Sequence, residues 1–196
     1  IIEWGFVDAP GNRDCPTILS DVNKGVNALL TAMGVGGQPV TTPPVNVQLY
    51  QSNSTKAQQF KFEYTGKTKK INGKTCYGVR IKNLSSGKYI DVAGAEKKNG
   101  TNIQVHPKNG TDAQLLWEER VIYETDMYAF FHSALKDNMV LDVAGGSHAN
   151  GSNIQLFEKN GTAAQKFTKV GTGAEKTYYI VNVGSGKSLD VLNGGK

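Results

Sequence analysis

The chain has 196 residues, which is enough for one ordinary domain with a small attachment but short for two full domains. Hydrophobic residues make up only 38% of it and glycines number 23, a composition that favours short strands and frequent turns over a helical bundle. The net charge of +5 is scattered, aromatic and basic residues are not interleaved, and no apolar run approaches the roughly 20 residues of a membrane helix. We therefore expect neither a nucleic-acid partner nor a membrane partner.

The first part of the chain, residues 1–36, does not recur elsewhere in the sequence. It begins with a predicted short strand that carries a single carboxylate, Glu3. From Pro16 onward, apolar residues at helical spacing predict a helix with one buried face that ends at Gly34. The apolar positions are Ile18, Leu19, Val22, Val26, Leu29, Leu30 and Met33. The glycine- and proline-rich residues 34–44 then predict a linker.

This strand, the turn after it and the helix resemble the C-terminal end of zinc-dependent N-acetylmuramoyl-L-alanine amidases, which close with a strand of the form (I/V)-(I/V)-E-x-G-F. The resemblance implies that Glu3 is a catalytic acid/base beside a zinc ion, whereas the residues alone also allow an ordinary carboxylate at a strand end. The family's zinc ligands lie upstream of this strand and have no counterpart here. We therefore expect that this chain is not catalytic as it stands and holds no cofactor, and that zinc belongs to a longer parent amidase.

Two kinds of sequence element recur in the rest of the chain. Residues 99–114 and 150–165 are identical at eleven of sixteen positions, at an offset of 51 residues, and residues 45–58 are a weaker copy. The second element is a glycine or asparagine turn that enters a short alternating strand, and it occurs three times. Its aspartates are Asp91, Asp142 and Asp190.

Two of these repeats are whole, and the third is split between the two ends of the chain. Its front half lies at residues 178–196 and its back half at residues 45–60. A closed three-fold structure can be opened at any loop without loss of contacts, so we interpret the split as a circular permutation. Three units of about 50 residues, each with four strands, predict an all-β barrel with a hairpin cap, a β-trefoil, because a propeller typically needs about four blades or more.

The repeats resemble the ricin-B lectin family with its Q-x-W signature. The signature glutamines are Gln58, Gln114 and Gln165, and the aromatic residues that follow them are Phe60, Trp117 and Phe167. Two copies carry Phe in place of Trp, and one copy has an extra residue. We predict that the glutamines tie adjacent turns and that the rings fill the core. The resemblance places a carbohydrate-binding β-trefoil at residues 37–196, after the amidase-like residues 1–36.

The resemblance also implies where a sugar binds. A sugar site needs a carboxylate that accepts hydroxyl protons, an amide that bridges hydroxyl groups and a ring that stacks on the apolar C–H face. The family's positions map onto the second repeat at Asp142, Gln155 and Phe157, with Asn160 nearby. They map onto the split repeat at Asp190, Gln48 and Tyr50, and onto the first repeat at Asp91, Gln104 and His106. We rank the sites in that order, because imidazole has less apolar face than Phe or Tyr and the split site depends on both chain ends.

Two points stay open for these sites. The three aspartates could serve only to fix turns. The polar Asn that often precedes the signature glutamine in sugar-binding members is replaced by alanine at Ala57, Ala113 and Ala164. The candidate substitutes are Asn53, Asn109 and Asn160.

The histidines and cysteines form no recognisable metal motif. His106, His132 and His148 lack H-x-x-x-H spacing, and we predict them on the surface or in loops. Cys15 and Cys76 are 61 positions apart and have no CxxC partner, so they form either one disulfide or two free thiols. We predict no metal site in this chain.

Together these patterns favour a carbohydrate-binding module that targets a cell wall. The first residues imply the C-terminal part of a peptidoglycan-hydrolysing amidase, an endolysin or autolysin, that is secreted to the extracellular space or the cell wall. Its expected partner is a glycan or cell-wall polysaccharide. Two other classes remain. One is a chain that is itself catalytic with zinc ligands from another chain, and the other is a non-lectin trefoil that binds protein, such as an inhibitor or a toxin subunit.

Overall fold

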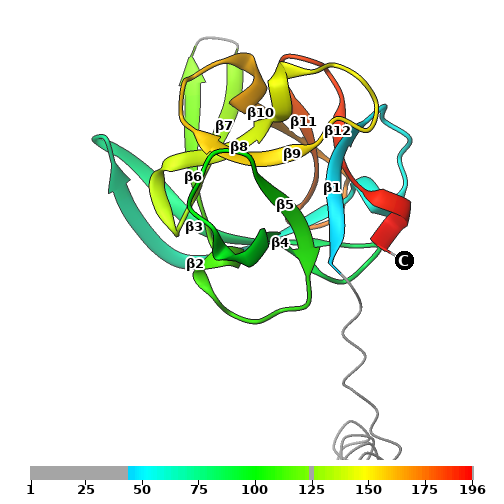
Figure 1. Ribbon diagram of the computed structural model, residues 1–196, viewed down its shortest axis with the longest axis horizontal. Helices are drawn as coiled ribbons and strands as arrows, with labels where there is room; N and C mark the ends of the chain where they lie inside the picture. Colours follow the sequence, from blue (N-terminus) through cyan, green and yellow to red (C-terminus); the bar gives the residue numbers. More distant parts are fainter. Residues whose placement is uncertain (1–43, 124–125, 196) are drawn as a thin grey trace, which may run out of the picture. The chain divides into compact units, whose positions relative to one another are not determined.

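The computed structural model describes residues 44–123 and 126–195 of the chain (Figure 1). They lie in the second of the two compact units into which the chain divides, Pro43–Lys196. The predicted N-terminal strand, helix and linker, with Glu3 and Cys15, lie outside the described residues, so the domain boundary and the roles of these residues stay predictions.

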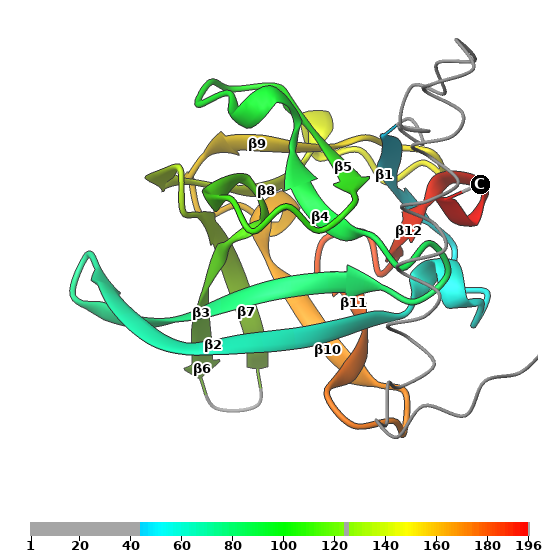
Figure 2. The same cartoon turned by 90° about the horizontal axis from the view of Figure 1, so that it is seen from below.

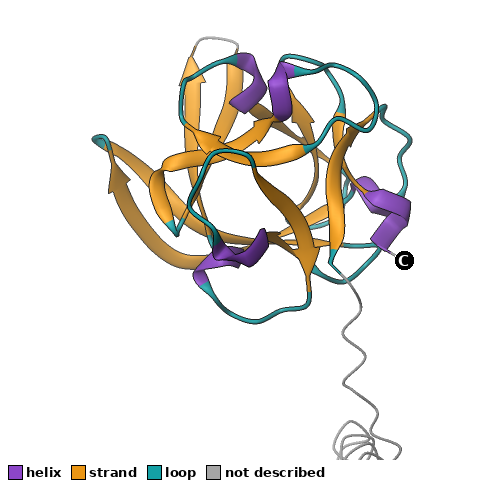
Figure 3. Cartoon of the chain, viewed as in Figure 1, coloured by secondary structure: helices purple, strands orange, loops and turns teal. Residues whose placement is uncertain are grey.

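The described unit is all-β, as predicted: twelve strands form one continuous sheet, and only short 3-10 turns are helical (Figure 3). The strands are β1 (Val45–Tyr50), β2 (Phe60–Ile71), β3 (Lys74–Asn83), β4 (Tyr89–Val92), β5 (Thr101–His106), β6 (Leu116–Tyr123), β7 (Asp126–Ser133), β8 (Lys136–Val143), β9 (Ile154–Glu158), β10 (Phe167–Gly171), β11 (Thr177–Asn182) and β12 (Ser188–Val191). The 3-10 turns are Lys56–Gln58, Ala93–Ala95, Asp112–Gln114, Ala144–Gly146, Ala163–Gln165 and Leu192–Gly195. Within these residues, no helix has the length and apolar character needed to cross a membrane.

Six of the strands close into an antiparallel barrel, which Figure 2 shows from the side. β2 pairs with β3, β3 with β6, β6 with β7, β7 with β10 and β10 with β11, and β11 returns to β2. Closure removes the unpaired edges that an open sheet presents. The interior holds fully buried rings: Phe131 lies 5.9 Å from Phe62 and 6.2 Å from Phe167, measured between ring centroids.

The other six strands form three hairpins, which lie above the barrel strands in Figure 2. β4 pairs with β5, β8 with β9 and β12 with β1. The hairpins also pair with one another, through β1–β5 and β5–β9, and an isolated bridge between Gln48 and Asn153 connects β1 to the chain that enters β9. The third hairpin therefore joins the last described strand to the first, and the two ends of the described chain meet in one element.

Strand alternation decides which hairpin residues reach the core. On β9, Ile154 and Leu156 are fully buried, and Gln155 between them turns to the opposite face. The same arrangement recurs on β5, where Ile103 and Val105 are buried on either side of a glutamine. Each hairpin thus contributes apolar residues to the core and presents polar residues on its other face.

The signature aromatic residues fill the core in two of the three copies. Phe60 and Phe167 are fully buried, as predicted. Trp117 is only half-buried, so the prediction that it fills the core is wrong. The extra residue in that copy shifts the alternation by one position, and Leu116 takes the buried place. The indole instead faces the ammonium of Lys69, which lies 5.9 Å from the ring centroid.

Three buried glutamine side chains clamp the turns that precede these residues. In Gln114, Oε1 accepts the N–H of Asn109 at 3.0 Å and Nε2 donates to the carbonyl of Pro107 at 2.9 Å. Gln58 and Gln165 make the same two bonds in their own repeats. All three glutamine side chains are fully buried, so each amide needs these backbone partners to satisfy its own donor and acceptor. The predicted role of these glutamines in tying turns is confirmed.

We expect Gln114→Ala to lower the free energy of unfolding by about 1–3 kcal/mol, because it removes the buried amide that bonds the N–H of Asn109 and the C=O of Pro107. Urea unfolding followed by circular dichroism measures the change. Gln51→Ala is the matched control, since the same truncation at an exposed side chain should change stability by less than about 0.5 kcal/mol. Similar losses from both substitutions would contradict the clamp.

Candidate functional site

Each of the three hairpins places an aspartate opposite a glutamine. The register pairs are Asp91 with Gln104, Asp142 with Gln155 and Asp190 with Gln48. In every pair the glutamine Nε2 donates to the aspartate Oδ1, at 3.0, 2.8 and 3.2 Å respectively. Among the described residues no backbone N–H donates to these carboxylates, which disfavours the alternative that they only fix turns. The arrangement instead holds a carboxylate and an amide side by side on the polar face of each hairpin.

A hollow of about 490 Å³ surrounds the pair of the second repeat. Asp142, Gln155, Phe157 and Asn160, the four residues predicted for this site, all line it. A second amide, that of Gln165, donates to the other oxygen of Asp142 at 3.1 Å. Because a carboxylate oxygen offers two lone pairs, each oxygen of Asp142 still has one with which to accept a ligand hydroxyl.

Burial and hydrogen bonding act in opposite directions on Asp142. The residue is only 5% exposed, and the loss of solvation raises the pKa of its carboxyl. The amide donors of Gln155 and Gln165 favour the charged form and lower the pKa, but burial is the larger effect and the pKa lies above its ordinary value. The carboxylate is therefore poorly solvated and can accept a further hydrogen bond.

The site of the split repeat takes residues from both ends of the described chain. Gln48 and Tyr50 lie on β1, and Asp190 lies on β12. All three line a hollow of about 350 Å³, together with Asn53 and Asn193. Tyr50 is 40% exposed, so part of its ring surface is available to a ligand.

The site of the first repeat has the same pair but a different ring. His106 ends β5 two positions after Gln104 and is half-buried. Its Nδ1 lies 3.0 Å from the carbonyl oxygen of Pro107, so one polar edge of the ring has a partner within its own turn. An imidazole presents less apolar surface than the phenyl ring of Phe157 or the phenol ring of Tyr50.

The three asparagines considered as substitutes begin the turns before the signature glutamines. The Oδ1 atoms of Asn53 and Asn109 accept both the N–H and the hydroxyl of the threonine two residues on. The Oδ1 of Asn160 accepts the N–H of Thr162 at 3.0 Å. Asn53 and Asn160 line the hollows of their repeats, and in the described part of the chain their Nδ2 groups have no hydrogen-bond partner. These Nδ2 groups are the donors available to a ligand.

Sequence reasoning missed the loop that follows each aspartate. Gly145 and His148 line the hollow of the second repeat, and Asn193 lines that of the split repeat. Gly145 and Asn193 each stand three residues after their aspartate and share a left-handed backbone, with φ of 62° and 52°. Gly94 occupies the same place in the first repeat, with φ of 60°. This shared position after the aspartate was the sequence signal that could have identified the loop.

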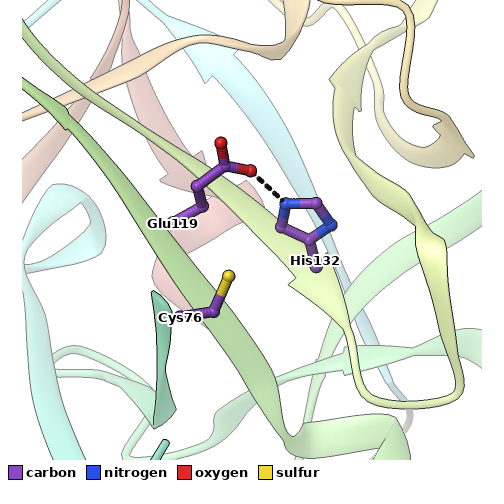
Figure 4. A group of neighbouring side chains, drawn as sticks. All are labelled: Cys76, Glu119 and His132. Carbon is purple, nitrogen blue, oxygen red and sulfur yellow. Dashed lines mark hydrogen bonds and ion pairs between the residues drawn. The ribbon is translucent and has the colours of Figure 1, made fainter. Parts of the chain in front are cut away.

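One histidine lies in a different environment from the predicted one. His132 is fully buried on β7, so the prediction of a surface or loop position is wrong for it, and it lies beside Cys76 and Glu119 (Figure 4). The apolar run that precedes it continues the strand, and spacing alone does not reveal its buried neighbours. His148 is exposed in a loop, as predicted. Cys76 is a buried free thiol in the described part of the chain, and Cys15 lies outside that part.

Comparisons with known proteins agree with this architecture. A family model described as ricin-type beta-trefoil lectin domain-like matches residues 56–157 and 120–196. The designed 3-fold symmetric protein ThreeFoil is 27% identical, with a TM-score of 0.54 over 60% of this chain and 80% of that chain.

Two natural proteins share less with the chain. An exo-β-1,3-galactanase from Clostridium thermocellum is 20% identical with a TM-score of 0.47, over 72% of this chain and 28% of that chain. A mosquitocidal holotoxin is 10% identical with a TM-score of 0.40, over 71% of this chain and 24% of that chain. These two TM-scores are too low to support any inference about this chain. No curated protein sequence matches it.

We expect the carboxyl of Asp142 to titrate above pH 3.8, its ordinary pKa, because burial disfavours the charged form. A folded-state pKa above the unfolded value favours folding at pH values below 3.8, and this contribution is lost as the pH rises through the folded pKa. The carboxyl-carbon NMR shift followed against pH measures the titration. Gln155→Ala removes a donor to the carboxylate and should raise the pKa further. A wild-type value at or below 3.8 would contradict the role assigned to burial.

Proposed function

The chain belongs to the ricin-type β-trefoil lectin-like family, and from this premise we propose that it is a carbohydrate-binding module that attaches to a glycan polymer. The family suggests carbohydrate binding, and the sites described above suggest how. The observation that carries the proposal is the aspartate–glutamine pair that recurs on all three hairpins beside a ring. A single carboxylate in a loop would not support it, because isolated surface carboxylates are common.

The chemistry of the pair suits a polyol. In the second repeat, Asp142 can accept hydroxyl hydrogens through both oxygens, and Asn160 can donate through Nδ2. Gln155 holds the carboxylate in position, so the acceptor is oriented before the ligand arrives. Phe157 supplies a flat apolar surface for the C–H face of a sugar ring. The site therefore matches a ligand that is polar at its edge and apolar on its face.

Three related sites favour a polymer over a single sugar. Each site is incomplete, since Ala57, Ala113 and Ala164 stand where a polar side chain would add a hydrogen bond. An incomplete set of hydrogen bonds gives weak binding at one site. When several sites engage one polymer, the second and third contacts become intramolecular and the overall affinity rises without new contacts.

We further infer that the third repeat is divided by circular permutation. β12 supplies Asp190 and β1 supplies Gln48, and the register of the two strands runs from Val47↔Val191 to Tyr50↔Ser188. Because the chain ends meet in this hairpin, the chain order can begin at this point of a closed structure without losing a contact. The site of the split repeat is then built on the same kind of hairpin, with the same aspartate–glutamine pair, as the sites of the whole repeats.

We also propose that the polymer is a cell-wall polysaccharide and that the module works outside the cell. In this proposal it is the C-terminal part of a peptidoglycan-hydrolysing N-acetylmuramoyl-L-alanine amidase. The support is the resemblance of residues 1–36 to the end of such enzymes, in which Glu3 takes the place of the catalytic acid/base. The module then holds the enzyme at its substrate, and the zinc ligands of the reaction come from residues upstream of the strand that carries Glu3.

We expect isothermal titration calorimetry to show weak, saturable binding of simple sugars and binding of cell-wall polysaccharide that is about 100-fold tighter or more. The double variant Asp142→Ala/Asp190→Ala should reduce the affinity for the polymer toward that for a single sugar, with an unchanged circular dichroism spectrum. A glycan array that includes non-wall polysaccharides identifies the polymer. No heat and no saturation with any glycan would refute the lectin function and favour a trefoil that binds protein.

The three sites should differ in strength. We expect Asp142→Ala and Phe157→Ala each to weaken glycan binding by about 1–3 kcal/mol, through loss of a charge-assisted hydrogen bond and of a stacking ring respectively. The matched changes Asp91→Ala and His106→Ala should have smaller effects, because the first repeat stacks its ligand on an imidazole. Calorimetry against one glycan compares the four variants. Equal or reversed effects would show that ring type does not set the ranking.

A further inference from the structure

Three side chains of different metal-ligating types, none of which lines the hollows of the second or the split repeat, converge on one buried face of the sheet (Figure 4). Cys76 on β3 is the register partner of Glu119 on β6, and His132 comes from the next strand, β7. All three residues are buried. Their sulfur, carboxylate oxygen and ring nitrogen lie within 4.8 Å of one another.

The imidazole of His132 is oriented as ligands of metal ions are. Its Nδ1 lies 2.6 Å from the carbonyl oxygen of Asp137, and since a carbonyl can only accept, Nδ1 carries the hydrogen. The other nitrogen, Nε2, therefore faces the interior of the cluster, 2.7 Å from Oε2 of Glu119. In protein metal sites the ring nitrogen that does not bind the metal donates to a carbonyl or carboxylate in this way, which fixes the tautomer and aims the ligating nitrogen.

The carboxylate of Glu119 lies at the centre of the cluster and contacts the other polar groups. Besides His132, the ammonium of Lys159 contacts it, with 2.5 Å between Nζ and Oε2. The Lys159 side chain is 23% exposed and its Nζ lies 4.1 Å from the centroid of the Phe130 ring. Lys159 is thus the partly solvated member of an otherwise buried group, and it marks the side from which an ion can enter.

We propose that Cys76, Glu119 and His132 bind one zinc ion, or a divalent ion of similar softness. Thiolate, carboxylate and imidazole are the three ligand types that zinc takes from proteins, and a thiolate disfavours calcium and magnesium. Tetrahedral bonds of about 2.0–2.3 Å place ligand atoms about 3.3–3.6 Å apart. The Nε2–Oε2 separation of 2.7 Å must therefore widen by about 0.6–0.9 Å, and the sulfur, which lies within 4.8 Å of both atoms, must settle at about 3.6 Å or less. Water completes the fourth position.

Binding of a divalent ion leaves the net charge of the cluster unchanged. The 2.7 Å contact between Nε2 of His132 and Oε2 of Glu119 needs one shared hydrogen, and the free thiol of Cys76 supplies a second. Both leave as protons to water when the divalent ion binds, so two positive charges leave and two enter. Lys159 keeps its ammonium beside Glu119. The buried group therefore gains no net charge, which removes the main cost of burying an ion.

The ion would join β3, β6 and β7 and, through the carbonyl of Asp137, the start of β8. The first three are strands of the barrel, and β8 is the first strand of the second hairpin. The site is accordingly structural, and its occupation should raise the thermal stability of the barrel. None of its three ligands lines the hollows of the second or the split repeat.

Cobalt titration of the full-length, tag-free chain after chelator treatment tests the proposal. We expect one Co²⁺ per chain, with a near-ultraviolet thiolate-to-metal band and the visible bands of a tetrahedral site, and we expect Zn²⁺ to displace both. The melting temperature should rise with Zn²⁺. Cys76→Ser should remove the thiolate band and weaken binding at least about tenfold, because it removes a ligand.

Two further variants distinguish binding at this cluster from binding elsewhere on the chain. Cys15→Ser, the matched control, removes the other thiol of the chain and should bind Co²⁺ as the wild type does. Lys159→Met removes the ammonium that competes for Glu119 and should tighten binding. No metal bound to the folded wild type at equimolar Co²⁺ or Zn²⁺, or a thiolate band that survives Cys76→Ser and is lost in Cys15→Ser, would overturn the proposal. The wild-type measurement decides even if a variant fails to fold.

Discussion

Pairing between the first and last described strands is the constraint on which the rest of this unit depends. β1 and β12 contribute Val47, Leu49, Leu189 and Val191, all fully buried, to the same core as the other two hairpins. β1 also pairs with β5, so the third hairpin is held by its neighbour as well as by itself. Without this pairing a third of the cap would expose its apolar face, and the strands that it covers would lose their packing.

Burial of charge along β6 adds a second constraint. Glu118 and Glu119 are adjacent and both buried, and alternation turns them to opposite faces of the strand. Glu118 pairs with Lys169 and with Arg120, at 2.8 Å from Nη2, and accepts a hydrogen bond from the hydroxyl of Tyr64 at 2.9 Å. Burial and the nearby carboxylate raise the pKa of that phenol. Glu118 has two cationic partners, so loss of one leaves the other, whereas Glu119 depends on Lys159 and its contact with His132.

Much of the fold was accessible from sequence because the repeats are strong local signals. The 51-residue offset and the strand–turn pattern predicted an all-β trefoil, and the resemblance to the ricin-B signature, with the amide chemistry of Gln58, Gln114 and Gln165, implied their shared role in the turns. The predictions that were wrong concern residues whose burial depends on a one-residue insertion or on strands that are distant in the sequence. One extra residue moved Trp117 to the outer face, because side chains alternate with a period of two. The burial of His132 depends on β3 and β6, and the spacing of the histidines in the sequence does not reveal those contacts. The loop after each aspartate was missed although its left-handed Gly or Asn recurs three residues after each aspartate, because the sequence does not show which loop lines a hollow.

The opposite orientation of core and polar residues on each hairpin has a consequence for how this protein can change. On β9, replacing Gln155 or Phe157 alters the outer face, while Ile154 and Leu156 still hold the strand in place. The residues of the outer face and those that stabilise the core thus occupy interleaved but separate positions. Since the hairpin exists in three versions, a substitution on the outer face of one leaves the outer faces of the other two unchanged. The architecture therefore offers an experimenter three outer faces that can be altered one at a time on a single core.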